Sequence, residues 1–318
     1  MSKTLETTQE VVKNSTFVKI NQEKLLEFAN NFSHSQTKHW LMAAPIDFKK
    51  FSDEEKLHFI FLFNSLSFCY WGEPKWTIEH DGQKLDGSWA MIKALNDGIK
   101  SGVPLLDFSY CSKIEKEKFA EILKGNVEIP LFVERWNILQ ELGTIMVEKF
   151  QGRAVNLLKE ANGDALKLLD LILENFPSFR DTSTYNDKEV CFYKRAQLLV
   201  ADIFQLFDGK DLGALKNVES LTACADYKLP QILRKSGILV YEKSLADKVD
   251  NKIELVHGSK EEVEIRANTI WVVELLRQEV SKIQPGIKAF EINDHLWLAT
   301  QEKFPDDKPY HRTRTTAY

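Results

Sequence analysis

The stretch SDEEKLHFIFLFNSL, residues 52–66, decides the fold class of this chain. Ser52 and Glu55 have the Ser-x-x-Glu spacing of a capping box, in which two side chains satisfy the first backbone N–H groups of a helix. Apolar residues then recur at helical spacing, at Leu57, Ile60, Phe61, Phe63 and Leu66. A start signal followed by a helical repeat predicts an apolar helix.

Similar signals along the chain favour an all-helical body. Capping signatures recur at Ser112 to Glu115 and at Ser259 to Glu262, and helical runs follow Pro130, span 190–207 and span 263–283. The run at 263–283 is predicted to be the longest helix. The motifs of dinucleotide-binding enzymes, phosphate-loop ATPases and α/β hydrolases are missing from the sequence, as are internal repeats. The predicted fold class is therefore mainly α.

Strand signals are sparse. Residues 76–88, WTIEHDGQKLDGS, read as a β-hairpin because Asp81 and Gly82 supply the positive φ angles of a tight turn. We expect a small two- or three-stranded appendage at this point of the helical body.

Composition narrows the class of protein further. The 318 residues are 43% hydrophobic and 28% charged, which is enough apolar material for a large core. We therefore expect a single domain over residues 1–318, with a flexible N-terminal stretch of about 15 residues. The formal net charge of −5 argues against tight binding to duplex nucleic acid.

The cysteines and the N-terminus bear on the compartment. Cys69, Cys111, Cys191 and Cys224 are far apart, form no Cys-x-x-Cys pair and stand among apolar residues, so we expect neither a disulfide nor a metal site. The polar, acid-containing N-terminus has the pattern of neither a secretory signal nor a transit peptide, and no apolar run approaches the ~20 residues that span a bilayer. A cytoplasmic protein without a membrane partner is expected.

The segment LTACADYKLP, residues 221–230, contains the first candidate for chemistry. It places Asp226 between small apolar residues and an aromatic, in a stretch that we interpret as helical. Aspartate is rarely fully buried unless it is paired or functional. Asp226 is therefore either a helix cap or satisfied core carboxylate, or a functional acid.

Three other places combine polar groups with aromatics. Residues 67–72, SFCYWG, could stack on a flat ring or belong to the ordinary core. Lys194 and Arg195 interrupt an apolar helix, either as a solvated face or as ligands for an anion. The tail YHRTRTTAY, residues 310–318, could fray, or it could dock and bring its cations to an anion.

Several long segments together resemble the queuosine salvage protein family, the queuosine 5′-phosphate N-glycosylase/hydrolases. They are SFCYW at 67–71, FPSFRD at 176–181, FYKRAQLLVAD at 192–202, SLTACADYKLPQIL at 220–233, EVEIRANTIWVVEL at 262–275 and HRTR at 311–314. The resemblance implies a helical fold similar to DNA glycosylases, without a cofactor. It also implies hydrolysis of a small-molecule nucleotide, queuosine 5′-monophosphate, to ribose 5-phosphate and queuine, which is then available for transfer RNA modification.

The resemblance also implies roles for residues of this chain. The Asp of the family's Ala-Asp-Tyr motif is the catalytic carboxylate, which matches Asp226, and residues just before it line the base pocket, which brings in Cys224. The base is a 7-deazaguanine, which lacks the ring nitrogen that purine glycosylases can protonate. More of the catalysis therefore falls on the sugar, where a carboxylate can stabilise the positive charge that develops at C1′.

The family resemblance and the charges of the side chains also predict further contacts with the substrate. The predicted base contacts are Cys224, Tyr227, Asn293, Asp294 and Phe68. Aligned on Leu296 and Trp297, Asn293 and Asp294 occupy positions where some members have Asp and Tyr; a one-residue gap would instead make Asp294 the acid and His295 the aromatic. The predicted phosphate donors are Lys194, Arg195, His311, Arg312 and Arg314.

Two alternative functions remain at this point. A glycosylase acting on nucleic acid would need a basic face and a helix-hairpin-helix with a Gly-rich turn, and the sequence indicates neither. A non-enzymatic helical module could instead bind a partner through exposed aromatics, and Asp226 would then be structural. An enzyme and a binding module differ in the effect of replacing Asp226. In an enzyme the replacement abolishes hydrolysis, whereas in a binding module it only destabilises the protein.

Overall fold

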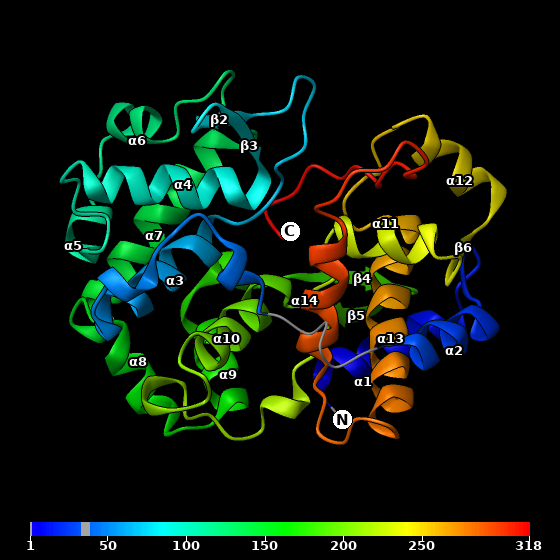
Figure 1. Cartoon of the computed structure of the whole chain (residues 1–318). Coiled ribbons are helices and arrows are strands. Elements are labelled where there is room, and N and C mark those ends of the chain that lie inside the picture. The colour runs from blue at the N-terminus through cyan, green and yellow to red at the C-terminus, as the bar shows by residue number, and fades with distance from the viewer. Residues whose placement is uncertain (1, 33–38) are drawn as a thin grey trace.

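Helices make up most of the structure, a computed structural model that describes residues 2–32 and 39–318 (Figure 1). The α-helices are α1 (Lys3–Lys13), α2 (Gln22–Asn31), α3 (Asp53–Leu66), α4 (Gly87–Lys100), α5 (Phe108–Cys111), α6 (Lys116–Ile122), α7 (Phe132–Phe150), α8 (Ala154–Ala161), α9 (Ala165–Asn175), α10 (Lys194–Leu206), α11 (Lys228–Lys235), α12 (Lys243–Asp250), α13 (Lys260–Ser281) and α14 (Ala289–Ala299). The mainly α fold class is confirmed, and α13 is the longest of these helices.

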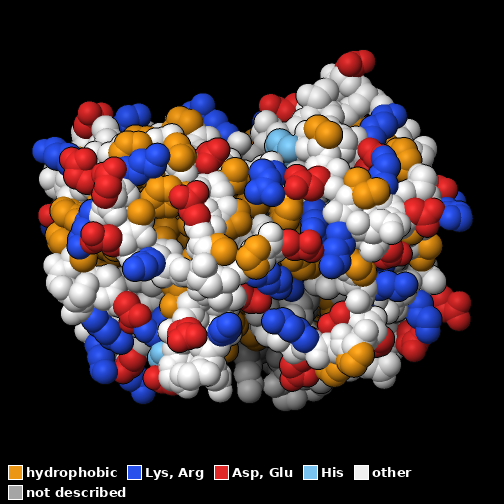
Figure 2. Space-filling view, turned by 90° about the horizontal axis from the view of Figure 1, so that it is seen from above, with side chains coloured by type: hydrophobic (Ala, Val, Ile, Leu, Met, Phe, Trp, Pro, Cys, Tyr) orange, Lys and Arg blue, Asp and Glu red, His pale blue; other side chains and the backbone are white. Residues whose placement is uncertain are grey.

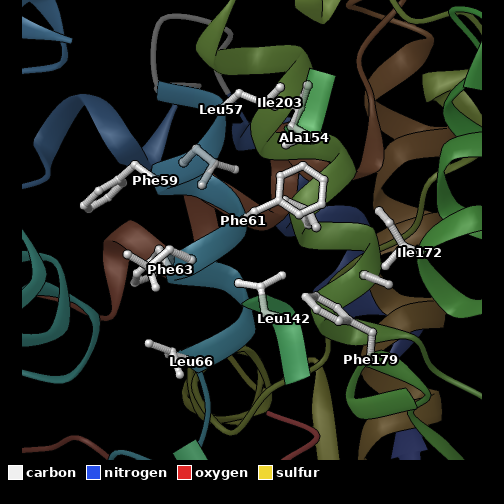
Figure 3. Close-up of a cluster of buried hydrophobic side chains, with 14 of the residues drawn as sticks. Leu57, Phe59, Phe61, Phe63, Leu66, Leu142, Ala154, Ile172, Phe179 and Ile203 are labelled. Carbon is white, nitrogen blue, oxygen red and sulfur yellow. The ribbon is translucent and has the colours of Figure 1, made fainter. Parts of the chain in front are cut away.

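Helix α3 is the centre of the larger core. The capping box is present as predicted, with the hydroxyl of Ser52 accepting from the Glu55 backbone and the Glu55 carboxylate accepting from the Ser52 backbone. From Leu57 to Leu66 every residue of the helix is buried, and α7, α8 and α10 pack around it. Figure 3 shows Phe61 directed from α3 toward the neighbouring helices, while Phe59 extends from the opposite side of α3. Each fully buried Phe contributes about 1.5–3 kcal/mol to folding.

Three boundaries differ from the sequence predictions. Ser112 ends α5 instead of capping a new helix, since its hydroxyl donates to the Ser109 carbonyl, and α6 begins only at Lys116. The run at 190–207 is helical only from Lys194, because its first two residues belong to a strand. Residues 221–226 are not helical, and α11 begins at Lys228.

The N-terminal segment also differs from the prediction. A flexible start was expected, but Lys3–Lys13 form helix α1, which packs against α13 and β5. Ser2 caps this helix, and Thr4, Thr8 and Val11 form its buried face. One buried face is enough to hold an amphipathic helix against the body of the protein.

The strands are short and form three two-stranded antiparallel sheets within the described residues. They are β1 (Val18–Ile20) with β6 (Leu239–Tyr241), β2 (Thr77–His80) with β3 (Gln83–Asp86), and β4 (Thr182–Tyr185) with β5 (Lys188–Cys191). The β2–β3 hairpin is the predicted one, and Asp81 and Gly82 have φ values of 49° and 76°. The β4–β5 hairpin was missed; its turn residues, Asn186 and Asp187, also have positive φ angles, of 48° and 60°, but the turn contains no glycine.

The two largest of the four hydrophobic clusters among the described residues meet at Trp297. The larger is built mainly from residues 40–221 and the smaller mainly from residues 18–32 and 223–296, while Trp297 packs against both. The C-terminal tail runs back between the two groups of helices, and the chain ends near the centre of the view (Figure 1). Tyr318 is buried there, and its carbonyl accepts from the Cys69 backbone at 2.8 Å, so the tail is docked and not frayed.

None of the helices in the described parts of the chain combines the length and the apolar character needed to cross a membrane.

Candidate functional site

A cavity of about 230 Å³ lies where the two cores meet. It brings together segments that are far apart in the sequence: the end of α3, the β2–β3 hairpin, the first residue of α10, the loop before α11, helix α14 and the tail. The predicted site residues that line it are Phe68, Lys194, Cys224, Asp226, Tyr227, Asn293 and Asp294. The hairpin is therefore not a mere appendage, because Lys84, Leu85 and Asp86 form part of the cavity wall.

Asp226 stands directly before α11 with its carboxylate held in one orientation. Its Oδ1 accepts hydrogen bonds from the backbone N–H groups of Lys228 at 2.7 Å and Leu229 at 3.0 Å. Asp226 thus caps the helix and also lines the cavity. Both bonds use one oxygen, and Oδ2 has no hydrogen-bond partner among residues 2–32 and 39–318. One oxygen fixes the side chain, and the other is available to a ligand.

A buried ion pair supports the loop that carries Asp226 and the start of α10, where Lys194 lies. Arg266 of α13 donates to both carboxylate oxygens of Asp181, at 2.9 and 2.5 Å, and its Nε donates to the Ala225 carbonyl at 3.1 Å. The same Asp181 carboxylate accepts from the backbone of Lys194 at 3.0 Å. Both charged residues lie within the segments that carry the family resemblance, but no local pattern indicated that they pair.

Helix α14 presents a polar pair to the cavity. Asn293 accepts from the Cys224 backbone at 2.9 Å and donates to Asp294 at 3.3 Å, while Gln205 donates to the other Asp294 oxygen at 3.1 Å. Burial raises the pKa of Asp294 from an ordinary 3.8 to about 7. His295 packs instead against Phe32, with ring centroids 5.0 Å apart, and is not among the residues that line the cavity.

Aromatic rings form much of the remaining wall. Phe68 is one of these rings, and the central guanidinium carbons of Arg135 and Arg195 lie 4.1 and 5.1 Å from its ring centroid. On another side, Trp89 and Trp297 have ring centroids 5.1 Å apart. These two tryptophans were not among the predicted contacts. Flat rings in a cavity of this size suit a planar ligand.

The phosphate donors predicted from charge are not gathered at the cavity. Lys194 lines it, with an ammonium group that has no hydrogen bond or ion pair among the described residues. Arg195 is fully buried, and its guanidinium donates to the carbonyls of Asn64, Ser65 and Ser178. These are carbonyls at the end of α3 and in a neighbouring turn, so Arg195 is a structural tether and neither a solvated residue nor an anion ligand.

The three tail cations also lie elsewhere. His311 is buried, its Nε2 is 3.1 Å from the Tyr318 hydroxyl, and burial lowers its pKa to about 3, so it is neutral at physiological pH. Arg312 pairs with Glu73, and Arg314 pairs with Glu254 at 3.3 Å while lying over the Trp71 ring. None of these three predicted phosphate donors is among the residues that line the cavity, and each already has a partner within the described part of the chain, so their predicted role finds no support in the cavity lining.

Other lysines line the cavity and were not predicted: Lys75, Lys84, Lys228 and Lys303. They come from the segment before β2, from β3, from the first residue of α11 and from the loop after α14. Figure 2 shows basic and acidic side chains intermixed over the face that includes the hairpin and the tail. That face therefore does not carry a wide basic surface.

Comparison with known proteins gives consistent matches along the chain. The family model described as "Queuosine salvage protein" matches residues 47–318. A Sphaerobacter thermophilus protein named "Queuosine 5'-phosphate N-glycosylase/hydrolase" is 40% identical over 324 residues, which cover 99% of this chain and 97% of that protein. Proteins of the same name are 39% identical in Mus musculus, covering 84% of this chain and 83% of that protein, and 30% identical in Dictyostelium discoideum, covering 98% of each.

Proposed function

Because the chain belongs to the queuosine salvage protein family, we propose that it hydrolyses the N-glycosidic bond of queuosine 5′-monophosphate. The products are queuine and ribose 5-phosphate. The observation that supports this most directly is Asp226, whose carboxylate lines the cavity while two backbone N–H groups hold its Oδ1. A carboxylate fixed in this way can face a sugar without having to reorganise during the reaction.

In the proposed reaction the bond between C1′ and the glycosidic nitrogen breaks, and its electron pair leaves with the base. Positive charge develops at C1′, and Asp226 stabilises it electrostatically. The oxygen of one water molecule bonds to C1′, and its proton is taken up as the base nitrogen becomes protonated. Water is thus added across the glycosidic bond, and no oxidant or reductant is consumed.

The base is proposed to lie between aromatic rings and the polar pair of α14. Phe68 and Tyr227 offer ring faces, while Asn293, Asp294 and Cys224 offer polar groups at the buried end of the cavity. A guanine-type edge carries N–H donors, and a carboxylate at Asp294 can accept from them. Lys194 remains in the proposal as a buried cation that donates to the substrate.

The test is to incubate the purified protein with queuosine 5′-monophosphate and to follow free queuine and ribose 5-phosphate by chromatography. Asp226→Asn keeps the shape of the side chain but removes its charge, and it should abolish release. Asp208→Asn is the matched control, since Asp208 is exposed after the end of α10 and pairs with Lys210. It should release base at the wild-type rate.

The outcomes separate the proposed function from the alternatives. Release from the free nucleotide that Asp226→Asn abolishes supports the proposal. Release only from queuosine within transfer RNA would indicate a nucleic-acid glycosylase. No release from either substrate by a folded protein would favour a non-enzymatic binding module.

A further inference from the structure

Five of the cavity residues form a charged group at its more exposed edge, which we call the mouth cluster: Lys75, Asp86, Lys228, Lys303 and Tyr310. The ammonium groups of Lys75 and Lys303 each lie 3.3 Å from Oδ2 of Asp86. The Lys228 ammonium lies 5.2 Å from the Tyr310 ring centroid. Three lysines and one aspartate leave the cluster with a net charge of two positive.

Lys228 is the least satisfied member of the mouth cluster. It is half-buried, and within residues 2–32 and 39–318 its ammonium has a cation–π contact with Tyr310 but no ion pair. Burial lowers the pKa of Lys228, and the nearby charges of Lys75 and Lys303 lower it further. Lysine is rarely buried without a partner of opposite charge. A bound anion would supply that partner and relieve the repulsion among the three cations.

The mouth cluster also adjoins the proposed catalytic carboxylate. Lys228 follows Asp226 by two residues, and its backbone N–H donates to Asp226 Oδ1 at 2.7 Å. In a nucleotide, C1′ and C4′ flank the ring oxygen, and the 5′-phosphate is attached to C4′ through C5′ and O5′, so the phosphate and C1′ are separated by roughly one ribose ring. A ribose held over Asp226 can therefore bring its phosphate to the lysines at the mouth.

We propose that the mouth cluster is the binding site for the 5′-phosphate of the substrate, with Lys75, Lys228 and Lys303 as donors. This site rests on the proposed function and deepens it, because it accounts for a nucleotide substrate. A phosphate monoester carries about −1.5 to −2 charges at neutral pH, which matches the charge of the cluster. Asp86 holds Lys75 and Lys303 in place, and the phosphate adds a second anion between the lysines.

Lys194 is the alternative candidate for binding the 5′-phosphate. Lys194 is 6% exposed and lies near the Cys224 thiol. Burial raises the pKa of that thiol, and the charge of Lys194 partly opposes this effect. A single lysine in an apolar environment neutralises only part of a phosphate dianion, and taking such an ion out of water is costly. We therefore assign Lys194 to the sugar or the base and the phosphate to the mouth cluster.

The experiment compares kcat/KM for queuosine 5′-monophosphate with kcat/KM for queuosine in wild type and in Lys75→Gln, Lys228→Gln, Lys303→Gln and Lys194→Gln. Lys243→Gln is the control, since Lys243 is exposed at the start of α12. Lys228→Gln should lower kcat/KM for the nucleotide roughly 10- to 100-fold, as expected for a lost charge-assisted hydrogen bond. Its kcat/KM for the nucleoside should change less than about twofold, because the nucleoside has no phosphate to lose.

Product inhibition gives a second readout. Ribose 5-phosphate should inhibit the wild type competitively, and the inhibition constant should rise in the three mouth variants by a similar factor. Lys194→Gln should instead reduce turnover of both substrates.

Each other result has a definite meaning. Equal losses on nucleotide and nucleoside in the mouth variants, or a nucleotide-specific loss in Lys194→Gln alone, would overturn the mouth cluster as the phosphate site while leaving the hydrolase intact. Equal wild-type kcat/KM values for the nucleotide and the nucleoside would also overturn the mouth cluster as the phosphate site. A wild type that cleaves neither substrate would instead refute the proposed function itself.

Discussion

Arg266 and Asp181 form a two-point ion pair in the interior of the protein, 85 residues apart in the sequence. The pair connects helix α13 to the turn before β4. Through its remaining bonds it also holds the Ala225 carbonyl, next to Asp226, and the backbone of Lys194. Two side chains of the candidate site are therefore positioned by one ion pair that does not itself line the cavity.

Breaking this pair should destabilise the protein strongly. Asp181→Asn leaves the fully buried Arg266 with a weaker partner, Glu262 at 3.6 Å, and removing one member of a buried pair costs about 3–5 kcal/mol. The free energy of unfolding from urea denaturation measures the loss. Asp250→Asn is the control, because it breaks the more exposed bidentate pair with Arg234 and should cost no more than about 1 kcal/mol. Equal effects in the two variants would contradict a special role for the buried pair.

Asp226 combines a structural and a chemical role, and two substitutions separate them. Asparagine caps helices about as well as aspartate, so Asp226→Asn should keep the free energy of unfolding near that of the wild type while activity falls at least 100-fold. Asp226→Ala removes the hydrogen bonds to α11 as well and should cost about 0.5–2 kcal/mol. Thermal melts and queuine release are measured on both. A large stability loss in Asp226→Asn would indicate that its charge is structural.

The pH dependence of substrate binding should follow Asp294. Because its pKa is raised to about 7, it is mostly protonated at pH 6 and mostly ionised at pH 8. The ionised form accepts hydrogen bonds from the base, so KM should fall as the pH rises from 6 to 8. In Asp294→Asn this inflection should be lost. A KM that rises over this range in the wild type would mean that the protonated acid is the binding form.

The raised pKa of Asp294 also predicts how the free energy of unfolding depends on pH. Folded Asp294 keeps a proton that the unfolded chain releases above about pH 4, so its contribution favours folding at low pH and is lost as the pH rises toward 7. The free energy of unfolding of Asp294→Asn relative to the wild type should therefore increase between pH 4 and 7, by at most about 1.4 kcal/mol per pH unit. Urea titrations at several pH values measure this difference, and a constant difference would contradict the raised pKa.

Docking of the tail should depend on the Tyr318 hydroxyl. That hydroxyl donates to Glu262 at 2.9 Å and lies 3.1 Å from Nε2 of His311. Tyr318→Phe leaves both buried groups without this partner, and we expect a loss of about 1–3 kcal/mol together with a higher KM, since Tyr318 lines the cavity. Tyr110→Phe is the control, because Tyr110 is only half-buried, and its stability change should stay within about 0.5 kcal/mol. An unchanged KM would mean that the Tyr318 hydroxyl does not contribute to substrate binding.

Local signals in the sequence were sufficient for much of the fold. The capping box of Ser52 and Glu55 and the turn at Asp81 and Gly82 each depend on residues within a few positions of one another, and both are present as predicted. The same signal failed at Ser112, where the hydroxyl bonds the preceding helix instead. Spacing alone cannot distinguish the two uses, because the hydroxyl group can donate or accept.

The candidate site was predictable only in part. Asp226 and the polar residues of α14 line one cavity, as the family resemblance implies, although their roles stay a prediction. The positions of the cations differ from the sequence prediction. Arg195 donates to carbonyls at the end of α3, whereas Lys228, which was not among the predicted phosphate donors, lines the cavity. Charge and position in the sequence do not say which partner a cation finds.

The sequence by itself thus determined the helical class, the β2–β3 hairpin and the family, because capping, turn chemistry and periodicity act over a few residues and long matching segments identify relatives. Only the tertiary structure decided which side chains meet. The pairing of Arg266 with Asp181, the docking of Tyr318 and the gathering of Lys75, Lys228 and Lys303 join residues from distant segments. Such contacts form when packing of the two cores brings the segments together, and no local pattern encodes them.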